Sequence, residues 1–325
     1  MFGISEKAKV RVYLIILSCL LILALSITLT TYTYAEYSKD AVMLEIRRAF
    51  KAICEAYNAG GDVKPLVNKL NEAILLLENY TKTNNPEYLI QAHNITAYII
   101  KEAPIIKARG EESVFWNNLY LVLEVSIVVV LAVLAYLYLP KIYLLSWFKA
   151  RSRDRVVVRR KRSDRKYMII NEEVWAVILA ILIVGSVFAI SQAYLSHRVI
   201  EPFSELGLLG KHMKIGDYPR KLIVGEEAFF YVYVGNHMGR PMYYIVMVKI
   251  GNRSTPIDPA PLKPVLTFER VLMNNETWIF PVHLKMSKPG INLRIIVELW
   301  IYNETTGKIQ YHNRWTQLWV NVTKI

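Results

Sequence analysis

The residue types that carry catalytic chemistry are scattered along this sequence. Its six histidines lack the paired spacing of metal ligands, there is no Gly-x-Ser-x-Gly elbow, and no phosphate-binding glycine loop precedes a helical segment. The C-terminal part has few aspartates, so a paired-carboxylate glycosidase would have to use scattered glutamates. We therefore predict a protein that is not an enzyme and that has no catalytic residue, metal or cofactor. The histidines are His93, His197, His212, His237, His283 and His312.

One modification signal does recur, the Asn-x-Ser/Thr acceptor of N-linked glycosylation. It occurs six times, where chance would give about two. The excess predicts real glycosylation and an extracytoplasmic setting, the alternative being accidental matches in asparagine-rich loops. The acceptors are Asn79, Asn94, Asn252, Asn275, Asn303 and Asn321.

The densest charge is the run Arg159-Arg160-Lys161-Arg162. Lysines and arginines beside a bilayer contribute about 1 kcal/mol each to binding anionic headgroups, so we expect this run to contact anionic lipid. Nucleic acid is the weaker alternative, because no aromatic stacking platform accompanies the run.

Three apolar segments must position these residues. Segments 12–29, 119–139 and 174–195 are each about as long as the roughly 20 residues that cross a bilayer. The loop 141–173 carries eleven basic and four acidic residues, whereas segment 36–112 carries ten and eleven. Basic residues stay in the cytoplasm, so we predict a cytoplasmic N-terminus and basic loop, with 36–113 and 197–325 outside. The six acceptors all fall in these outer segments.

The first span has a rival reading as a cleaved signal peptide, because Thr33 and Ala35 offer small residues before Glu36. Its apolar run exceeds the usual length of such peptides, which favours an uncleaved anchor within 1–35. Cys19 in this span and Cys54 outside it are too far apart to form a disulfide.

Two features inside the predicted bilayer suggest helix packing or a partner subunit. Glu124 lies in the second span (114–140), where an unpaired charge is costly, so it is protonated, faces protein or water, or reaches the outer surface. Gly185, Ala189 and Ala193 form a small-residue stripe on the third span (174–196), which allows close helix packing.

The outer segment 36–113 shows helical spacing of apolar residues. Gly60-Gly61 ends a first helix, Asp62 caps a second, and Asn84-Asn85-Pro86 separates it from a third that we expect to end at Pro104. The prediction is a small helical bundle, which is either a spacer or a docking surface for another subunit.

Beyond residue 197 the pattern changes to strand alternation, as in Phe230, Val232 and Val234. Roughly seven short strands separated by Pro, Gly and Asn turns predict an immunoglobulin-like β-sandwich over 197–325. The fold class is thus an α+β membrane protein with three transmembrane helices, a helical bundle and a sandwich.

A series of short motifs carries a family resemblance. Phe203-Ser204-Glu205-Leu206-Gly207-Leu208-Leu209-Gly210, Tyr218-Pro219, Val224-Gly225-Glu226 and Val234-Gly235-Asn236-His237 follow one another in order. In these, residues 170–300 resemble the archaeal membrane-protein family of domain of unknown function 1616. Lys211 stands where that family usually continues with Gly-Pro. The resemblance implies membrane spans ahead of an extracytoplasmic β domain and implies no activity. The glycines and Tyr218-Pro219 are read as turn and fold determinants.

These patterns together predict a non-enzymatic membrane subunit or scaffold of an archaeal-type cell envelope. A specific version is an accessory subunit of an oligosaccharyltransferase or protein-translocation complex, with membrane lipids and other membrane subunits as partners. The alternative is an S-layer or adhesion anchor whose outer β domain binds surface glycan or protein.

Overall fold

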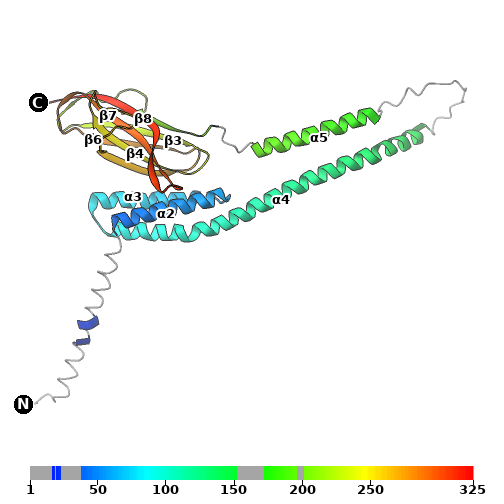
Figure 1. Ribbon diagram of the computed structural model, residues 1–325, viewed down its shortest axis with the longest axis horizontal. Coiled ribbons are helices and arrows are strands. Elements are labelled where there is room, and N and C mark those ends of the chain that lie inside the picture. The colour runs from blue at the N-terminus through cyan, green and yellow to red at the C-terminus, as the bar shows by residue number, and fades with distance from the viewer. Residues whose placement is uncertain (1–16, 19, 23–37, 152–171, 196–200, 325) are drawn as a thin grey trace, which may run out of the picture. The chain divides into compact units, whose positions relative to one another are not determined.

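The computed structural model describes residues 17–18, 20–22, 38–151, 172–195 and 201–324 (Figure 1). The chain divides into two compact units. The first combines Met1–Glu111 with Glu201–Ile325, and the second is Glu112–Ile200.

The first unit begins with the predicted helices. Helix α2 (Lys39–Asn58) is capped by Ser38, whose Oγ accepts the Ala41 amide at 3.2 Å, and it is followed by Gly60 with φ 84°. Helix α3 (Lys64–Thr83) ends at Asn84 in the left-handed conformation. The N-cap of α3 is Val63 rather than the predicted Asp62, because the chain turns one residue later. The Asp62 carboxylate still accepts the Lys64 amide at 3.1 Å.

The predicted end of the third helix at Pro104 is wrong, because helix α4 (Glu87–Arg151) continues through this proline. A proline removes one backbone donor and crowds the preceding turn, which weakens a helix locally. Here Ile99 and Ala103 are buried in the core on either side of that turn, and the side chains of Ile100 and Lys101 are exposed. Tertiary packing therefore outweighs the local cost.

The second unit contains the part of α4 that follows Glu111, together with helix α5 (Glu172–Leu195). Among the residues searched, one helical segment, Glu87–Leu131, is long and apolar enough to cross a membrane. The predicted span 174–195 lies within α5, where only some side chains are described, and most of 12–29 lies outside the described residues. Within the predicted basic loop, residues 141–151 are the helical end of α4, and 152–171 are not described.

The C-terminal part of the first unit is a two-sheet sandwich, with a three-stranded sheet in the order β1-β3-β6 and a five-stranded sheet in the order β2-β8-β7-β4-β5. All neighbours are antiparallel except β2 and β8. The strands are β1 (Phe203–Leu209), β2 (Lys221–Ile223), β3 (Glu227–His237), β4 (Met242–Gly251), β5 (Leu266–Leu272), β6 (Thr277–Lys285), β7 (Gly290–Asn303) and β8 (Lys308–Thr323).

The sequence prediction missed β1 and β2. Gly207, interpreted as a turn residue, lies inside β1 opposite Tyr233 of β3. The predicted turns at Gly216 and Gly225 are confirmed by φ values of 113° and 94°. Gly210 is required for a different reason, because a Cβ there would lie 1.9 Å from the Gly216 carbonyl oxygen.

The two sheets enclose an apolar core that includes Phe230, Val232, Val246, Val297 and Leu299. A second core lies on the other face of the five-stranded sheet, where the helices pack. There Phe50 of α2 is 1% exposed and contacts the rings of Tyr243 and Tyr302, with centroids 5.5 and 6.2 Å away. The helices and the five-stranded sheet therefore share this second core.

The same face of the five-stranded sheet carries a buried ion pair. Lys249 Nζ lies 2.7 Å from Glu298 Oε2, and the two side chains are 4% and 0% exposed. Glu298 also accepts the Ala260 amide and the Trp300 indole N–H, while Lys249 donates to the Ala260 carbonyl. The pair thereby fixes the β4–β5 connection against the sheet.

Candidate functional site

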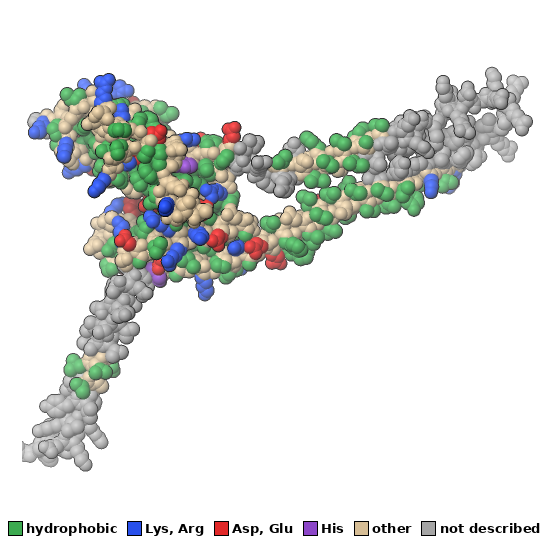
Figure 2. All heavy atoms as spheres, viewed as in Figure 1, with side chains coloured by type: hydrophobic (Ala, Val, Ile, Leu, Met, Phe, Trp, Pro, Cys, Tyr) green, Lys and Arg blue, Asp and Glu red, His purple; other side chains and the backbone are tan. Residues whose placement is uncertain are grey.

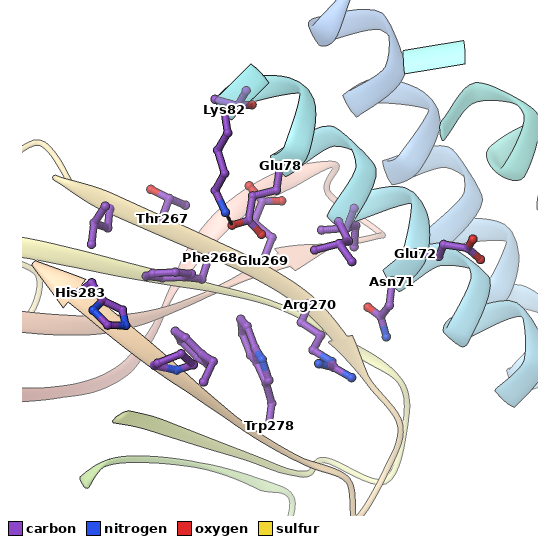
Figure 3. A pocket seen from close by; sticks show the side chains of 16 residues that line it. Asn71, Glu72, Glu78, Lys82, Thr267, Phe268, Glu269, Arg270, Trp278 and His283 are labelled. Carbon is purple, nitrogen blue, oxygen red and sulfur yellow. Dashed lines mark hydrogen bonds and ion pairs between the residues drawn. The ribbon is translucent and has the colours of Figure 1, made fainter. Parts of the chain in front are cut away.

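A surface hollow of the first unit runs along strand β5, one edge of the five-stranded sheet (Figure 3). It has a volume of about 860 Å³, with α3 on one side and β6 of the other sheet on the opposite side. A smaller hollow of about 280 Å³ adjoins it and shares Thr267 and Glu269. We call the two together the β5 groove.

Asn71 of α3 occupies one position along this edge. Its Nδ2 donates to the Val271 carbonyl oxygen at 2.8 Å, and its Oδ1 accepts the Val271 amide at 2.8 Å. This pair of bonds is the pattern that a residue of a neighbouring antiparallel strand would make. The side-chain amide of Asn71 therefore takes the place of a strand at the end of β5.

The remaining edge of β5 is open. Because N–H and C=O groups of alternate residues point to the same side of a strand, Thr267 and Glu269 direct their backbone groups outward as Val271 does. Among the described residues these outward groups have no hydrogen-bond partner. Two consecutive strand-pairing positions thus face the groove.

The other sheet edges are protected in different ways. Strand β6 contains Pro281, which lacks an N–H and is tolerated only where that position faces away from a partner strand. Strand β2 is three residues long, and β1 lies against β8. Short edges and edge prolines are the usual ways to prevent strand addition. Strand β5 has seven residues and no proline.

Aromatic and aliphatic side chains line the groove on both sides of β5. The ring centroids of Phe268 and Phe280 are 4.7 Å apart, and those of Phe280 and Trp278 are 4.0 Å apart. These contacts close the gap between the two sheets. On the α3 side, Leu75 is 54% exposed. The groove can therefore receive apolar side chains at alternate positions of an extended segment.

The charges of the groove are mixed, with Glu72, Glu78 and Glu269 balanced by Lys39, Lys82 and Arg270. Burial raises the pKa of Glu269, although its Oε2 accepts the Tyr243 hydroxyl at 2.6 Å and Arg47 is nearby. Glu78 forms an exposed ion pair with Lys82 at 2.7 Å. Figure 3 shows these carboxylates beside Thr267, on the helix side of the strand.

A serine–histidine pair lies elsewhere in the sandwich. His312 Nε2 is 2.8 Å from Ser204 Oγ, which is 2.6 Å from the Tyr244 hydroxyl. The Tyr244 hydroxyl in turn donates to Asn236 Oδ1 at 3.2 Å. Ser204 is only 3% exposed and Asn236 is fully buried, so this chain links four strands rather than presenting a nucleophile to solvent. Asn236 of the sequence motif is thus a fold determinant.

This network predicts acid sensitivity. Burial, with Arg314 adding to it, lowers the pKa of His312, so the folded protein holds this ring neutral. Protonation then favours the unfolded state. Stability should be constant above about pH 6.5 and decline below it, at most by about 1.4 kcal/mol per pH unit for this group. Thermal unfolding across pH 5–8 should show a shallower decline for His312→Gln. His212→Gln, in an exposed loop, is the control and should leave the profile unchanged.

The predicted glycosylation acceptors all lie on the first unit, and none is buried. Asn94, Asn252 and Asn275 are exposed, whereas the others are half-buried. Asn79 and Asn94 lie on helices, and Asn275 lies in the β5–β6 turn with φ 63°. The structure does not bring these six residues together into one site.

The predicted membrane residues are only partly described. Glu124 on α4 is exposed, and Gly185 on α5 has no atom within 4 Å of the position of a Cβ. The side chains of Ala189 and Ala193 and the whole run Arg159-Arg160-Lys161-Arg162 lie outside the described residues.

The sequence prediction missed the β5 groove. Asn71 and Val271 are 200 residues apart, and Asn71 has the polarity expected of any solvated helix face. The sequence shows only that Asn71 is a polar residue beside the apolar stripe of the second helix. This pattern does not identify a strand as the partner of Asn71.

Fold and groove define a helical layer packed on a β-sandwich with one open sheet edge. Residues 198–321 match the family model of the Domain of unknown function (DUF1616). This match confirms the resemblance drawn from the sequence motifs. No curated protein matches the chain.

Solved structures resemble the chain weakly. A CARDB domain from Pyrococcus furiosus, crystallised with di-metal ions, is 17% identical over 38% of this chain and 89% of its own, with a TM-score of 0.27. A β-glucosidase from Listeria innocua is 14% identical over 38% of this chain and has the same TM-score, but the match spans only 16% of that enzyme. A complex of Zinc 2-glycoprotein and Prolactin inducible protein from human seminal plasma matches at 10% identity over 38% of this chain and 98% of that chain, with a TM-score of 0.25. Function is therefore inferred from this chain's own residues.

Proposed function

We propose that this protein is a non-enzymatic, membrane-anchored scaffold subunit that binds an extended segment of a partner protein by adding it as a strand to β5. The observation that carries the proposal is the Asn71 amide, which pairs with Val271 as a strand would and leaves Thr267 and Glu269 unpaired beside it. Strand addition to an exposed edge is a recurrent mode of peptide recognition, with main-chain bonds giving affinity and pockets for alternate side chains giving specificity.

The shared core supports the membrane topology of this proposal. Residues on the two sides of Glu112–Ile200 pack in one core, so they must lie on the same side of any membrane. The chain between them then crosses an even number of times. Since α4 contains an apolar segment that could cross, α5 is the natural second crossing. With the first predicted span, this gives three crossings, a cytoplasmic N-terminus and an extracytoplasmic C-terminal domain, in agreement with the glycosylation acceptors.

The groove indicates the chemistry of the partner. An added strand would direct alternate side chains toward Leu75 on one side and toward Phe268 and Trp278 on the other. Glu72 and Glu78 at the helix wall are balanced by Lys82 and Arg270, so the charge of the groove favours neither sign. The partner segment is thus extended and mainly apolar. An accessory subunit of a translocation or oligosaccharyltransferase complex would use such a groove to hold a neighbouring subunit.

Replacing Thr267 with proline tests this proposal. The change removes an outward N–H and blocks the added strand, while the bonds between β4 and β5 use the opposite side. The full chain purified in mild detergent should contain a stoichiometric partner, identified by mass spectrometry, and Thr267→Pro should lose it. In the intact complex, hydrogen exchange of the Thr267 and Glu269 amides should be at least about tenfold slower than in the free chain.

Ile279→Pro is the matched control, because it removes an outward N–H from β6, an edge that Pro281 already blocks. This variant should retain the partner. The proposal fails if the chain elutes alone, if both proline variants lose the partner, or if the partner leaves exchange at Thr267 and Glu269 unchanged.

A second candidate function has its own observation. Phe229, Tyr231 and Tyr233 alternate along β3 on the outer face of the three-stranded sheet, beside the exposed side chain of Ile279. Glu205 Oε2 accepts the Tyr233 hydroxyl at 2.6 Å. A surface of half-buried aromatic rings with a carboxylate at its edge suits a surface glycan, as an envelope adhesion anchor would require. Binding of glycan arrays by the full chain, lost on Tyr231→Ala, would favour this function over the groove.

A further inference from the structure

One end of the sandwich, which we call the basic end, is strongly positive. Its β1–β2 (210–220), β4–β5 (252–265) and β6–β7 (286–289) connections carry two exposed acids, Asp217 and Asp258, and six exposed basic residues: Lys211, Lys214, Arg220, Arg253, Lys263 and Lys288. The rest of this end adds Lys221, Lys285 and Lys324 against Glu226 and Glu227. Figure 2 shows blue side chains gathered at the part of the sandwich that carries the C-terminus in Figure 1.

The positive charge of the basic end is not compensated within the part of the chain that the structure describes. There, none of the nine basic side chains forms an ion pair. Two of the four acids have other partners, because Glu226 Oε2 accepts the Ile223 amide at 2.9 Å and Glu227 Oε2 lies 3.2 Å from His283 Nδ1. The basic end can therefore attract a negatively charged surface.

The chain joins the predicted membrane spans at the opposite end of the first unit. Strand β3 runs from the basic end to His237, about 33 Å away at 3.3 Å per residue, and Phe203 at the start of β1 pairs with His237. The Tyr57 hydroxyl at the end of α2 donates to the Gly239 carbonyl at 2.9 Å. Gly110 of α4 lies beside the turn that follows α2, where a Cβ on Gly110 would lie 2.5 Å from a backbone nitrogen. Residues 110 and 203, which flank Glu112–Ile200, are therefore both at the end away from the basic end.

The basic end also exposes large aliphatic side chains. Ile215 is 87% exposed, Ile291 is 81% exposed and Met213 is 55% exposed. Met213 and Ile215 alternate with lysines along the β1–β2 connection. Exposed apolar side chains that are rimmed by polar residues mark surfaces that bind a partner.

A hollow of about 540 Å³ opens between the β4–β5 and β6–β7 connections. Its walls include the apolar side chains of Ile250, Leu262 and Leu293, and it is also lined by Lys285 and Lys288. The hollow can therefore receive an apolar side chain whose neighbours carry negative charge.

We propose that the basic end docks an acidic segment of a second protein, one that also presents apolar side chains. Lys285 and Lys288 pair with its carboxylates, the hollow receives an apolar side chain, and Ile215 and Ile291 are covered by the partner. An apolar centre with a charged rim is the usual composition of a protein interface, and complementary charge guides the encounter. The chain would thus have a second docking surface besides the β5 groove.

Other anionic partners fit this surface less completely. Nucleic acid and acidic polysaccharide match the charge but leave the aliphatic hollow unused, and nucleic acid binding calls for aromatic stacking groups. Lipid of the chain's own membrane is not favoured, because the connections to the predicted spans leave from the opposite end. This last step rests on the proposed membrane anchorage, which resistance of the chain to alkaline extraction checks independently.

Zero-length cross-linking tests the inference, because a carbodiimide joins a lysine amine to a carboxylate only where the two groups are in contact. The full chain is cross-linked in the native membranes of its own cells, and the joined peptides are identified by mass spectrometry. We expect Lys285 and Lys288 to be joined to aspartates or glutamates of one segment of one other protein. About 0.5 M salt, added before the reaction, should lower the yield at least about fivefold.

The decisive variant leaves both reactive lysines in place. Ile215→Ser with Ile291→Ser removes the apolar contact and should lower the yield at least about fivefold. Leu44→Ser with Ile100→Ser makes the same change at exposed aliphatic side chains of the helices and should leave the yield unchanged. Ser254→Ala removes the predicted glycosylation motif beside the hollow and should not lower the yield.

Other outcomes overturn the inference. They are the lack of any cross-link at Lys285 and Lys288, cross-links to many proteins without a common segment, and an equal loss in the control variant. Equal yields from the Ile215→Ser, Ile291→Ser variant and the unchanged chain would assign the surface to polyanions in general. Binding of phosphatidylglycerol vesicles by the purified chain, without protein cross-links, would assign it to lipid. Thr267→Pro should leave the cross-links in place, so these readings are separate from partner binding at the β5 groove.

Discussion

Replacing Glu298 with alanine is expected to lower the free energy of unfolding by about 3–5 kcal/mol. The substitution leaves the Lys249 ammonium buried without its carboxylate, and it removes the acceptor of the Ala260 amide and the Trp300 indole. Thermal unfolding of the full chain in mild detergent, followed by near-ultraviolet circular dichroism, measures the loss. The β4–β5 connection should also become sensitive to protease, since the pair fixes it.

Two further variants separate a buried pair from ion pairs in general. Glu78→Ala breaks the exposed Lys82–Glu78 pair and should cost no more than about 0.5 kcal/mol. Lys249→Met with Glu298→Leu removes both charges and should recover the part of the loss that comes from the unpaired ammonium, while the Ala260 amide and the Trp300 indole still lack their acceptor. A Glu298→Ala loss as small as that of Glu78→Ala would contradict the burial seen here.

Phe50→Ala is expected to cost about 3–5 kcal/mol, because it removes a buried aromatic side chain and leaves a cavity beside Tyr243 and Tyr302. Since α2 and the five-stranded sheet share this core, both should lose stability together. Hydrogen exchange measured on peptides from α2 and from β4 in one sample should accelerate in both.

Leu44→Ala is the matched control, because Leu44 lies on the same helix with 49% of its side chain exposed. It should change stability by less than about 0.5 kcal/mol. If Phe50→Ala accelerated exchange in α2 and left β4 unchanged, the helices and the sandwich would be independent domains, contrary to the shared core.

Local patterns predicted most of the elements. Gly60-Gly61 and Asn84-Asn85-Pro86 mark helix ends because they favour backbone conformations that a helix interior excludes. Strands β3, β4, β6 and β7 follow from alternation because one side of each strand faces the sandwich core. Where the pattern was overridden, packing was the cause, as at Pro104 in α4 and at Gly207 in β1.

The candidate site depends on contacts that no local pattern encodes. Asn71 contacts Val271, and Phe50 contacts Tyr302, although the whole of Glu112–Ile200 lies between the partners in the sequence. The sequence shows that β5 contains no proline and that β6 contains Pro281. It does not show which strands form the edges of the sheets. The open edge therefore became visible only from the strand order.

The shared core also constrains how the protein is made. Phe50 is synthesised about 250 residues before Tyr302, and the two proposed membrane crossings lie between them. The helical layer must therefore wait, with its apolar face uncovered, until the later strands emerge on the same side. A chain with one crossing missed would place the two halves in different compartments, where neither could complete its packing. Correct insertion would thus be a precondition of folding, and misinserted copies would remain recognisable to envelope proteases.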